Sequence, residues 1–114
     1  MILYGIKNCN TVKSAIVWLN KNKIEFAFHD YKKLGITQAK LTEWCQQIGW
    51  ESLVNKRGTT WRQLDEGIKK KITNEKAAIA LMLEKTSVIK RPVVEKNGKV
   101  LLLGFDEDEY KTKL

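Results

Sequence analysis

The hydrophobic period changes twice within residues 2–31, and this pattern limits the possible folds more than any other feature of the chain. Residues 2–4 (Ile-Leu-Tyr) form a short apolar run that predicts a buried strand, and residues 24–31 (IEFAFHDY) alternate and predict a second strand. Between them, apolar residues recur at helical spacing, at Val12, Ala15, Ile16 and Leu19. A strand, a helix and a strand in so short a segment predict a βαβ unit with parallel strands and a right-handed crossover.

The C-terminal part of the chain carries a hairpin signal followed by a helix signal. Two apolar runs in residues 93–104 (VVEKNGKVLLLG) flank Asn97-Gly98, a pair that favours the type I′ turn because both central residues need a positive φ. The acidic stretch 106–109 predicts the N-terminus of a helix, where negative charge is stabilising. The chain therefore ends in a predicted ββα unit.

Residues 36–86 have a different composition and predict a helical block. Four helical segments are expected there: 37–49, 50–54, 60–64 and 74–84. Thr37 is a suitable N-cap for the first segment, and Thr60 with Gln63 three residues later has the spacing of a capping box.

At 114 residues the chain is long enough for one sizeable core, and we expect a single domain over residues 1–114. Residues 1–35 and 87–114 would form an α/β core, a small mixed four-stranded sheet flanked by helices. Residues 36–86 would be a helical insertion between the second strand and the ββα unit.

Charge and composition narrow the class of protein. The net charge is +8, from 21 basic and 13 acidic residues, which favours anionic ligands without specifying one. We interpret the lysine cluster at 69–71 as a solvated face and expect no nucleic-acid partner. No apolar run approaches the roughly 20 residues that span a bilayer, and the first residues do not resemble a signal peptide. We therefore expect a cytoplasmic protein with no membrane partner.

The chain has two cysteines, Cys9 and Cys45, and one histidine, His29. This small number fits a reducing compartment better than a disulfide framework. Neither a CxxC motif nor a metal-ligand spacing is present, so we expect no metal site. His29 alternates out of a strand pattern, which favours a structural or hydrogen-bonding role.

Cys9 lies at the turn from the first predicted strand into the first predicted helix. Free backbone N–H groups and the helix dipole favour a thiolate there, and Asn8 and Lys13 are the neighbours expected to stabilise it. By position alone, Cys9 is equally compatible with a small buried hydrophobe. Cys45 lies beside Trp44 on an apolar stripe, where a cysteine packs as a hydrophobic side chain.

Two arginines complete the candidate site. Arg91 precedes Pro92, and both belong at the start of an edge strand because proline cannot donate to a sheet ladder. Arg57 lies in a loop before a helix. With Cys9 these arginines would form an anion-binding thiol site, although either could be simply solvated.

Several motifs now carry a resemblance over nearly the whole chain: LYGIKNCNTVKSA, FHDYKK, GW at 49–50, NKRGTTWRQLD, IKRPVV and LLLGFDEDEY. In order and spacing they resemble the arsenate reductase (ArsC)/Spx family of thioredoxin-like proteins, and most closely its YffB-type branch. The resemblance implies a thioredoxin-like fold with a helical insertion, and a cis Arg91–Pro92 bond facing Cys9. It also implies that Cys9 is the nucleophile and that Arg57 and Arg91 bind anions.

The sequence departs from that family at three places. The third anion-binding arginine of arsenate reductases belongs near Gly104-Phe105, where this chain has no arginine. Lys13 stands where arsenate reductases usually carry an arginine, and lysine replaces a bidentate clamp with a point charge. The CxxC of many Spx regulators is absent, because residues 9–12 read Cys-Asn-Thr-Val.

These features predict a thiol oxidoreductase with a single nucleophilic cysteine, with glutathione as co-substrate and no bound cofactor. The backbone beside Pro92 would pair with an extended substrate. Small thiols, oxyanions and glutaredoxin are the other candidate partners. Two alternatives stay open: an arsenate reductase coupled to glutathione and glutaredoxin, and a non-enzymatic Spx-like regulator that contacts RNA polymerase.

Overall fold

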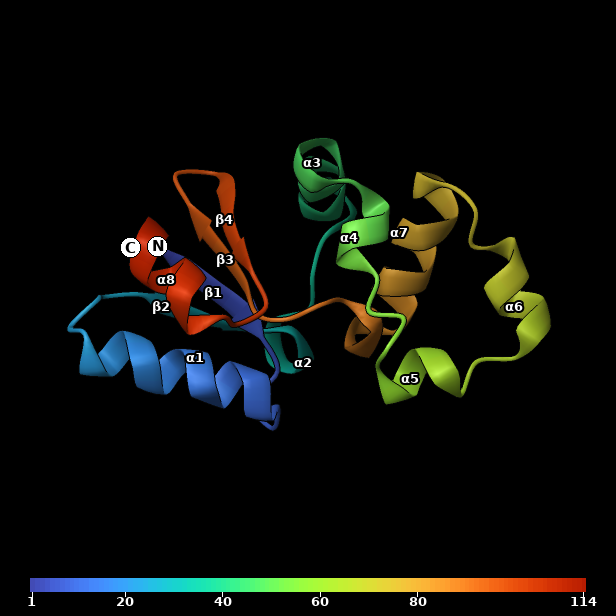
Figure 1. The fold of residues 1–114 in the computed structure, drawn as a ribbon. Coiled ribbons are helices and arrows are strands. Elements are labelled where there is room, and N and C mark those ends of the chain that lie inside the picture. Colours follow the sequence, from blue (N-terminus) through green and yellow to red (C-terminus); the bar gives the residue numbers. More distant parts are fainter. The chain divides into compact units, whose positions relative to one another are not determined.

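The N-terminal and C-terminal segments of the chain meet in one sheet. The computed structural model describes residues 1–114, which form two compact units. The sheet unit comprises Met1–Leu34 and Arg91–Leu114, and the helical unit comprises Gly35–Lys90. The elements of the sheet unit are β1 (Ile2–Gly5), α1 (Asn10–Lys21), β2 (Ala27–Asp30), α2 (Tyr31–Leu34), β3 (Val93–Lys96), β4 (Lys99–Leu103) and α8 (Glu107–Lys113) (Figure 1). That both units belong to one domain stays a prediction.

The sheet has four strands in the order β2-β1-β3-β4. β1 runs parallel to β2 and antiparallel to β3, and β3 and β4 form an antiparallel hairpin. This mixed sheet confirms the expected architecture, including the parallel βαβ unit. β2 is shorter than expected and begins only at Ala27, because Lys23 has a positive φ of 58° and the Ile24 N–H still donates to the Leu19 carbonyl, 3.0 Å away.

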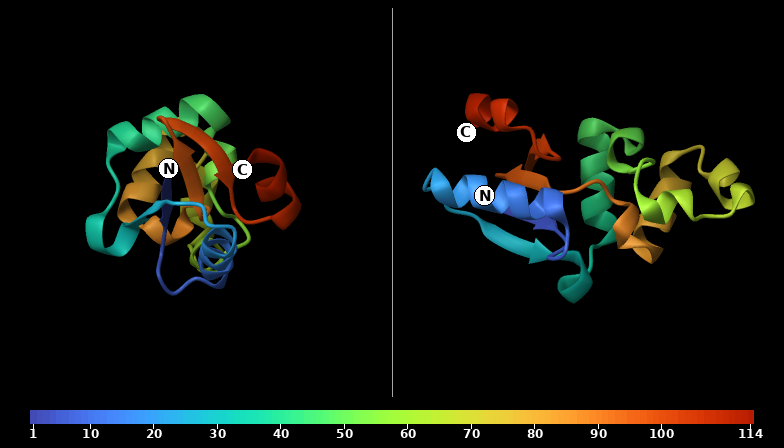
Figure 2. Two further views of the ribbon diagram at one scale, coloured as in Figure 1. Left: turned by 90° about the vertical axis from the view of Figure 1, so that its left-hand side faces the viewer. Right: turned by 60° about the horizontal axis from the view of Figure 1, so that its bottom comes forward.

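One face of the sheet carries the core of the sheet unit. Leu3, Val94 and Leu102 from three strands pack against the buried side of α1 and against Tyr110 of α8. The rings of Trp18 and Tyr110 meet edge to face at 5.5 Å, so α1 and α8 cover the same face (Figure 2). Burying this apolar surface fixes α1 against β1, and with it the turn that contains Cys9.

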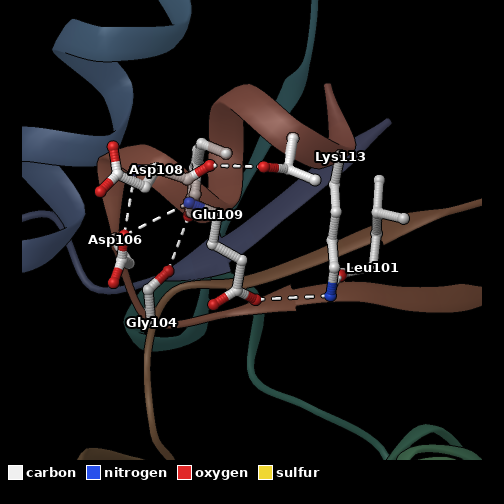
Figure 3. A network of polar contacts seen from close by, with 8 residues as sticks. Leu101, Gly104, Asp106, Asp108, Glu109 and Lys113 are labelled. Carbon is white, nitrogen blue, oxygen red and sulfur yellow. Dashed lines mark hydrogen bonds and ion pairs between the residues drawn. The ribbon is translucent and has the colours of Figure 1, made fainter.

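The C-terminal helix begins where its acidic residues predict. Asp106 caps α8, since its side chain accepts hydrogen bonds from the Asp108 and Glu109 N–H groups at 3.0 and 3.3 Å (Figure 3). The Tyr110 hydroxyl donates to the Gly104 carbonyl at 2.7 Å, which ties the helix to the end of β4. Lys113 closes the helix with an ion pair to Glu109 at 3.4 Å.

The hairpin turn also confirms its sequence signal. Asn97 and Gly98 have φ values of 53° and 78°, the left-handed region that a type I′ turn requires at both positions. The turn sets the register that brings Glu95 opposite Val100, and a bulge between Val94 and Glu95 then shifts the pairing so that Val93 lies opposite Leu103.

The helical unit contains a helix at each of the four expected segments. Its elements are α3 (Gln38–Ile48), α4 (Trp50–Leu53), α5 (Thr59–Arg62), α6 (Glu66–Lys71), α7 (Glu75–Glu84) and the 3-10 helix η1 (Thr86–Val88). Thr37 caps α3 by accepting from the Lys40 N–H at 3.1 Å, and Asn74 caps α7 by accepting from the Ala77 N–H at 2.9 Å.

The expected capping box at Thr60 is wrong. α5 starts at Thr59 with Gly58 as its N-cap residue, so Thr60 already lies inside the first turn. The cause is Asn55, which fixes the preceding loop by accepting hydrogen bonds from Arg57 N–H at its side chain and from Gly58 N–H at its carbonyl. α6, capped by Asp65, is an additional helix that the apolar pattern did not predict.

Candidate functional site

The candidate site is built on the turn between β1 and α1. Cys9 is the N-cap residue of α1, with an extended backbone, and its carbonyl accepts the Lys13 N–H at 2.9 Å. Gly5 at the end of β1 allows α1 to come this close, because a Cβ there would lie 2.8 Å from Val12 Cγ2. The sequence therefore positions the cysteine through a glycine and through the buried stripe of α1.

The surroundings of Cys9 favour its thiolate. Partial burial alone would raise the pKa of the thiol, but the Val12 N–H, a hydrogen bond from the Arg91 side chain, the positive charge of Arg91 and the Thr11 N–H together outweigh it. The pKa of Cys9 therefore lies below its ordinary value. The Cys9 side chain makes no N-cap hydrogen bond in the structure, and the Val12 and Thr11 N–H groups nevertheless favour its charged form.

Arg91 lies in the segment between the helical unit and β3, and β3 is an inner strand of the sheet, so the expected edge strand is wrong. The Arg91–Pro92 peptide bond is cis, as the resemblance implied. The Pro92 carbonyl accepts the Gly104 N–H at 2.8 Å, which anchors this segment beside β4. The sheet unit thus brings together the sequence-predicted residues Cys9, Arg91 and Pro92.

A polar cluster behind the site was missed by the sequence reasoning. The buried Tyr4 hydroxyl donates to the Glu95 carboxylate at 3.1 Å, and the Tyr4 ring lies 4.7 Å from the His29 ring and 6.3 Å from the Tyr31 ring. Burial and the charges of Tyr4 and Glu95 raise the pKa of Tyr31, while the positive charge of Arg91 lowers it. The positive charge of Arg91 therefore acts both on Tyr31 of this cluster and on the Cys9 thiol.

The alternation of the strands gives no signal of this cluster. Tyr4, His29 and Glu95 occupy positions that face away from the α1 side of the sheet. Alternation alone reads such positions as exposed, and Glu95 is 4% exposed. The His29 ring packs against the Tyr4 and Tyr31 rings of this cluster, and its structural role stays a prediction.

The remaining predicted site residues are Asn8, Lys13 and Arg57. None of them is among the groups that shift the pKa of Cys9. Asn8 and Lys13 have exposed side chains on either side of Cys9, and their thiolate-stabilising roles stay predictions. Arg57 belongs to the helical unit, where its N–H donates to Asn55 Oδ1 at 3.2 Å. Its anion-binding role also stays a prediction.

Cys45 lies in the apolar interior of the helical unit. It is 5% exposed on α3, beside the fully buried Leu41 and Trp44. Burial raises the pKa of its thiol to about 11, and the negative charge of Glu75 acts in the same direction. Both cysteines are free thiols.

No group of three or more His, Cys, Asp or Glu side chains is arranged to hold a metal ion. None of the helices combines the length and the apolar character needed to cross a bilayer.

A mixed sheet with the nucleophile candidate at the first strand–helix turn, beside a cis X–Pro bond, defines a thioredoxin-like protein. Residues 4–113 match the ArsC family, and the chain belongs to that family.

Similar proteins fall into three groups. The structure of a YffB protein is 47% identical and superposes with a TM-score of 0.91 over 99% of this chain and 97% of that one. An arsenate reductase (ArsC) related protein from Brucella melitensis is 40% identical with a TM-score of 0.80, over 97% and 91% of the two chains. The global transcriptional regulator Spx of Lactiplantibacillus plantarum is 26% identical over 97% of this chain and 83% of its own. The family therefore includes reductase-related proteins and regulators.

Proposed function

We propose that this protein is a thiol oxidoreductase that works through Cys9 and uses glutathione as its co-substrate. The observation that carries the proposal is the position of the Cys9 thiol beside the Val12 N–H and the Arg91 guanidinium, which lower the pKa of the thiol. A thiolate at neutral pH is the nucleophile that thiol–disulfide exchange requires.

The reaction takes place in two exchanges. The Cys9 thiolate attacks the glutathione sulfur of a glutathionylated thiol, which forms a Cys9–glutathione disulfide and releases the substrate as its thiolate. A second glutathione thiolate attacks that disulfide, regenerates the Cys9 thiolate and leaves as oxidised glutathione. The net change reduces one mixed disulfide and oxidises one glutathione. An external thiol completes the cycle because Cys45, buried in the helical unit, is a poor resolving thiol.

The other residues have supporting roles in this proposal. Arg91 and Arg57 bind the carboxylates of glutathione, while Lys13 and Asn8 stabilise the thiolate. The backbone at Pro92 pairs with an extended substrate. No metal or bound cofactor takes part, and the reducing cytoplasm keeps both thiols in the free state that the cycle needs.

The test is mass spectrometry of the protein after incubation with oxidised glutathione, followed by peptide mapping. We expect one adduct, located on Cys9, that reduced glutathione removes. A turnover assay on a glutathionylated peptide, coupled to glutathione reductase, should then show multiple cycles.

Two matched variants serve as controls. Cys9→Ser should abolish both the adduct and turnover, while Cys45→Ser should keep both. An adduct confined to Cys45, or turnover that survives in Cys9→Ser, would contradict the proposal.

Arsenate reduction is a second candidate because the Brucella melitensis relative is described as related to arsenate reductase. We expect weak arsenate turnover, since the sequence has no arginine near Gly104-Phe105 and carries Lys13 in place of a second guanidinium. The measurement is arsenite formed with glutathione and glutaredoxin, compared with a known arsenate reductase. Comparable turnover would favour this candidate.

A regulator is the third candidate, favoured by the Spx relatives at 26% identity. Such a protein would bind RNA polymerase and would need no thiol chemistry. Binding to RNA polymerase that is unchanged in Cys9→Ala, together with the absence of turnover, would select this candidate over the enzyme.

A further inference from the structure

An apolar groove lies beside the thiol site, within the sheet unit. It has a volume of about 680 Å³, and its floor is formed by Ile16 and Val17 of α1, Phe28 of the edge strand β2 and Leu34 of α2. Ile16 and Phe28 also pack against the core, which holds the floor in place. Val17 and Leu34 are 65% and 68% exposed, a large apolar exposure for side chains that line one cavity.

The rim of the groove is positively charged. Lys7, Lys13 and Lys33 line it, against a single carboxylate, Asp30. Asp30 is 8% exposed and accepts a hydrogen bond from the Lys32 N–H at 2.9 Å, so it is engaged at the start of α2. An apolar floor inside a lysine rim is complementary to a ligand that carries apolar groups next to carboxylates.

The groove is within reach of the nucleophile. Lys7 and Lys13 lie two residues before and four residues after Cys9, so one end of the groove borders the first turn of α1. Val17 lies eight residues beyond Cys9, or about 12 Å along the helix. An extended peptide covers that distance in three to four residues, at roughly 3.3 Å each.

We infer that this groove binds an acidic peptide segment of the disulfide substrate, with an apolar side chain three to four residues from the glutathionylated cysteine. This inference rests on the proposed thiol–disulfide function and names its substrate class. Leucine-sized side chains occupy the floor, and neighbouring glutamates pair with the lysine rim.

Binding is tested first without any thiol chemistry. A fluorescent peptide carries a serine in place of the cysteine, two leucines three and four residues away from it, and flanking glutamates. Two versions are made, one with the leucines before the serine and one with the leucines after it. At least one version should bind about tenfold tighter than two control peptides, one with serines in place of the leucines and one with lysines in place of the glutamates. Its binding should weaken at high salt.

Variants of exposed residues locate the contact. Val17→Asp and Leu34→Asp should each weaken binding about tenfold, because a carboxylate would enter the apolar floor. Lys33→Glu should reduce affinity and its salt dependence. Ile68→Asp is the matched control, since Ile68 is also an exposed apolar residue, at 43%, but lies on α6 of the helical unit. Equal losses in Ile68→Asp would overturn the inference.

The reactive peptide then tests the spacing. With a glutathionylated cysteine in place of serine, the rate of adduct formation on Cys9 should be about tenfold higher for leucines at three and four residues than for leucines adjacent to the cysteine. Equal rates for both spacings would overturn the inference. The reaction of Val17→Asp with oxidised glutathione should stay at the wild-type rate, which shows that the thiol site is intact.

The two proposals fail in different ways. If oxidised glutathione modifies Cys9 but neither peptide version binds, the groove inference is wrong and the thiol function stands. If a peptide binds with the expected variant pattern but no disulfide reacts, the thiol function fails and the groove is a docking site without that chemistry. Tighter binding of dodecanoate or of anionic vesicles than of the peptide, lost in Val17→Asp, would replace the peptide by a lipid and overturn the inference.

Discussion

Cys9 and Cys45 are the same residue type on two helices, yet their surroundings differ in almost every respect. Cys9 is the half-buried N-cap residue of α1 in the sheet unit, and the Arg91 side chain acts on its sulfur. Cys45 lies within α3 in the helical unit, buried between apolar side chains. Burial raises the pKa of both thiols, so burial does not explain why only one of them becomes acidic.

The difference lies in the donors that remain available. At the start of a helix the first N–H groups have no intrahelical partner, so those of Thr11 and Val12 can act on the Cys9 sulfur. Inside α3 such groups are used by the helix itself, and the charge that acts on Cys45 is the negative one of Glu75. Thiol acidity in this protein is therefore set by helix position and by one long-range arginine contact.

The largest expected effect is the difference in reactivity of the two thiols. With a pKa of about 11, roughly one Cys45 thiol in ten thousand is ionised at pH 7. Cys9 should be alkylated by iodoacetamide on the order of a hundredfold faster or more, as measured by peptide mass spectrometry over time. Similar rates for the two thiols at pH 6 to 7 would remove the basis of the comparison.

Arg91→Ala should raise the midpoint of Cys9 alkylation toward that of an ordinary thiol. Because Arg91 lowers the pKa of Cys9, the alkylation rate should fall most below the ordinary thiol pKa, about tenfold near pH 6. The difference should vanish at high pH, where the Cys9 thiol is ionised in both the variant and the wild type. Cys45 in the same sample serves as an internal control and should not change. A pH profile identical to that of the wild type would show that Arg91 has no electrostatic role at the thiol.

Replacing Cys45 should affect stability and spare thiol chemistry. Cys45→Ser places a hydroxyl in an apolar interior and should cost about 1–2 kcal/mol of unfolding free energy in urea denaturation. The adduct of Cys9 with oxidised glutathione should form at the wild-type rate. Cys45→Ala is the matched control, because it removes volume without adding a polar group. A loss of Cys9 reactivity in either variant would show that thiol chemistry in the sheet unit depends on the interior of the helical unit.

Lys13→Ala should give the smallest change. The Lys13 side chain is exposed and absent from the interactions that lower the pKa of Cys9, so its charge acts through solvent. Alkylation of Cys9 near pH 6 should slow by about twofold at low salt, less than in Arg91→Ala, and the effect should disappear at high salt. A loss as large as that of Arg91→Ala would give Lys13 a direct role.

The fold was predictable where its signals are local. A short apolar run predicted β1, and helical spacing predicted α1. Two apolar runs around Asn97-Gly98 predicted the β3–β4 hairpin and its turn with two positive φ values. The start of β2 was not predictable from alternation, because the positive φ at Lys23 and the last turn of α1 delay the strand. Thr60 had the right spacing for an N-cap, but Asn55 fixes the preceding loop so that α5 begins at Thr59 and Gly58 takes the N-cap position.

The site was predictable only in part. The position of Cys9 follows from a short local pattern, whereas the partner of its sulfur comes from Arg91, a residue far along the chain that only the family resemblance placed nearby. The Tyr4–Glu95 hydrogen bond is a tertiary contact between two strands, and no pattern in either strand alone indicates a buried carboxylate.

The discontinuous sheet unit has a consequence for the order in which this protein is synthesised. β1 is flanked by β2, made early, and by β3, made after the whole helical unit, so the central pairing joins residues 2–4 to residues 93–95. The ribosome releases the N-terminal part first, and such distant pairings form late because their loop is long. We expect the nascent chain to expose Cys9 with the acidity of an ordinary thiol, and the arrival of Arg91 to activate it only after the whole helical unit has been made.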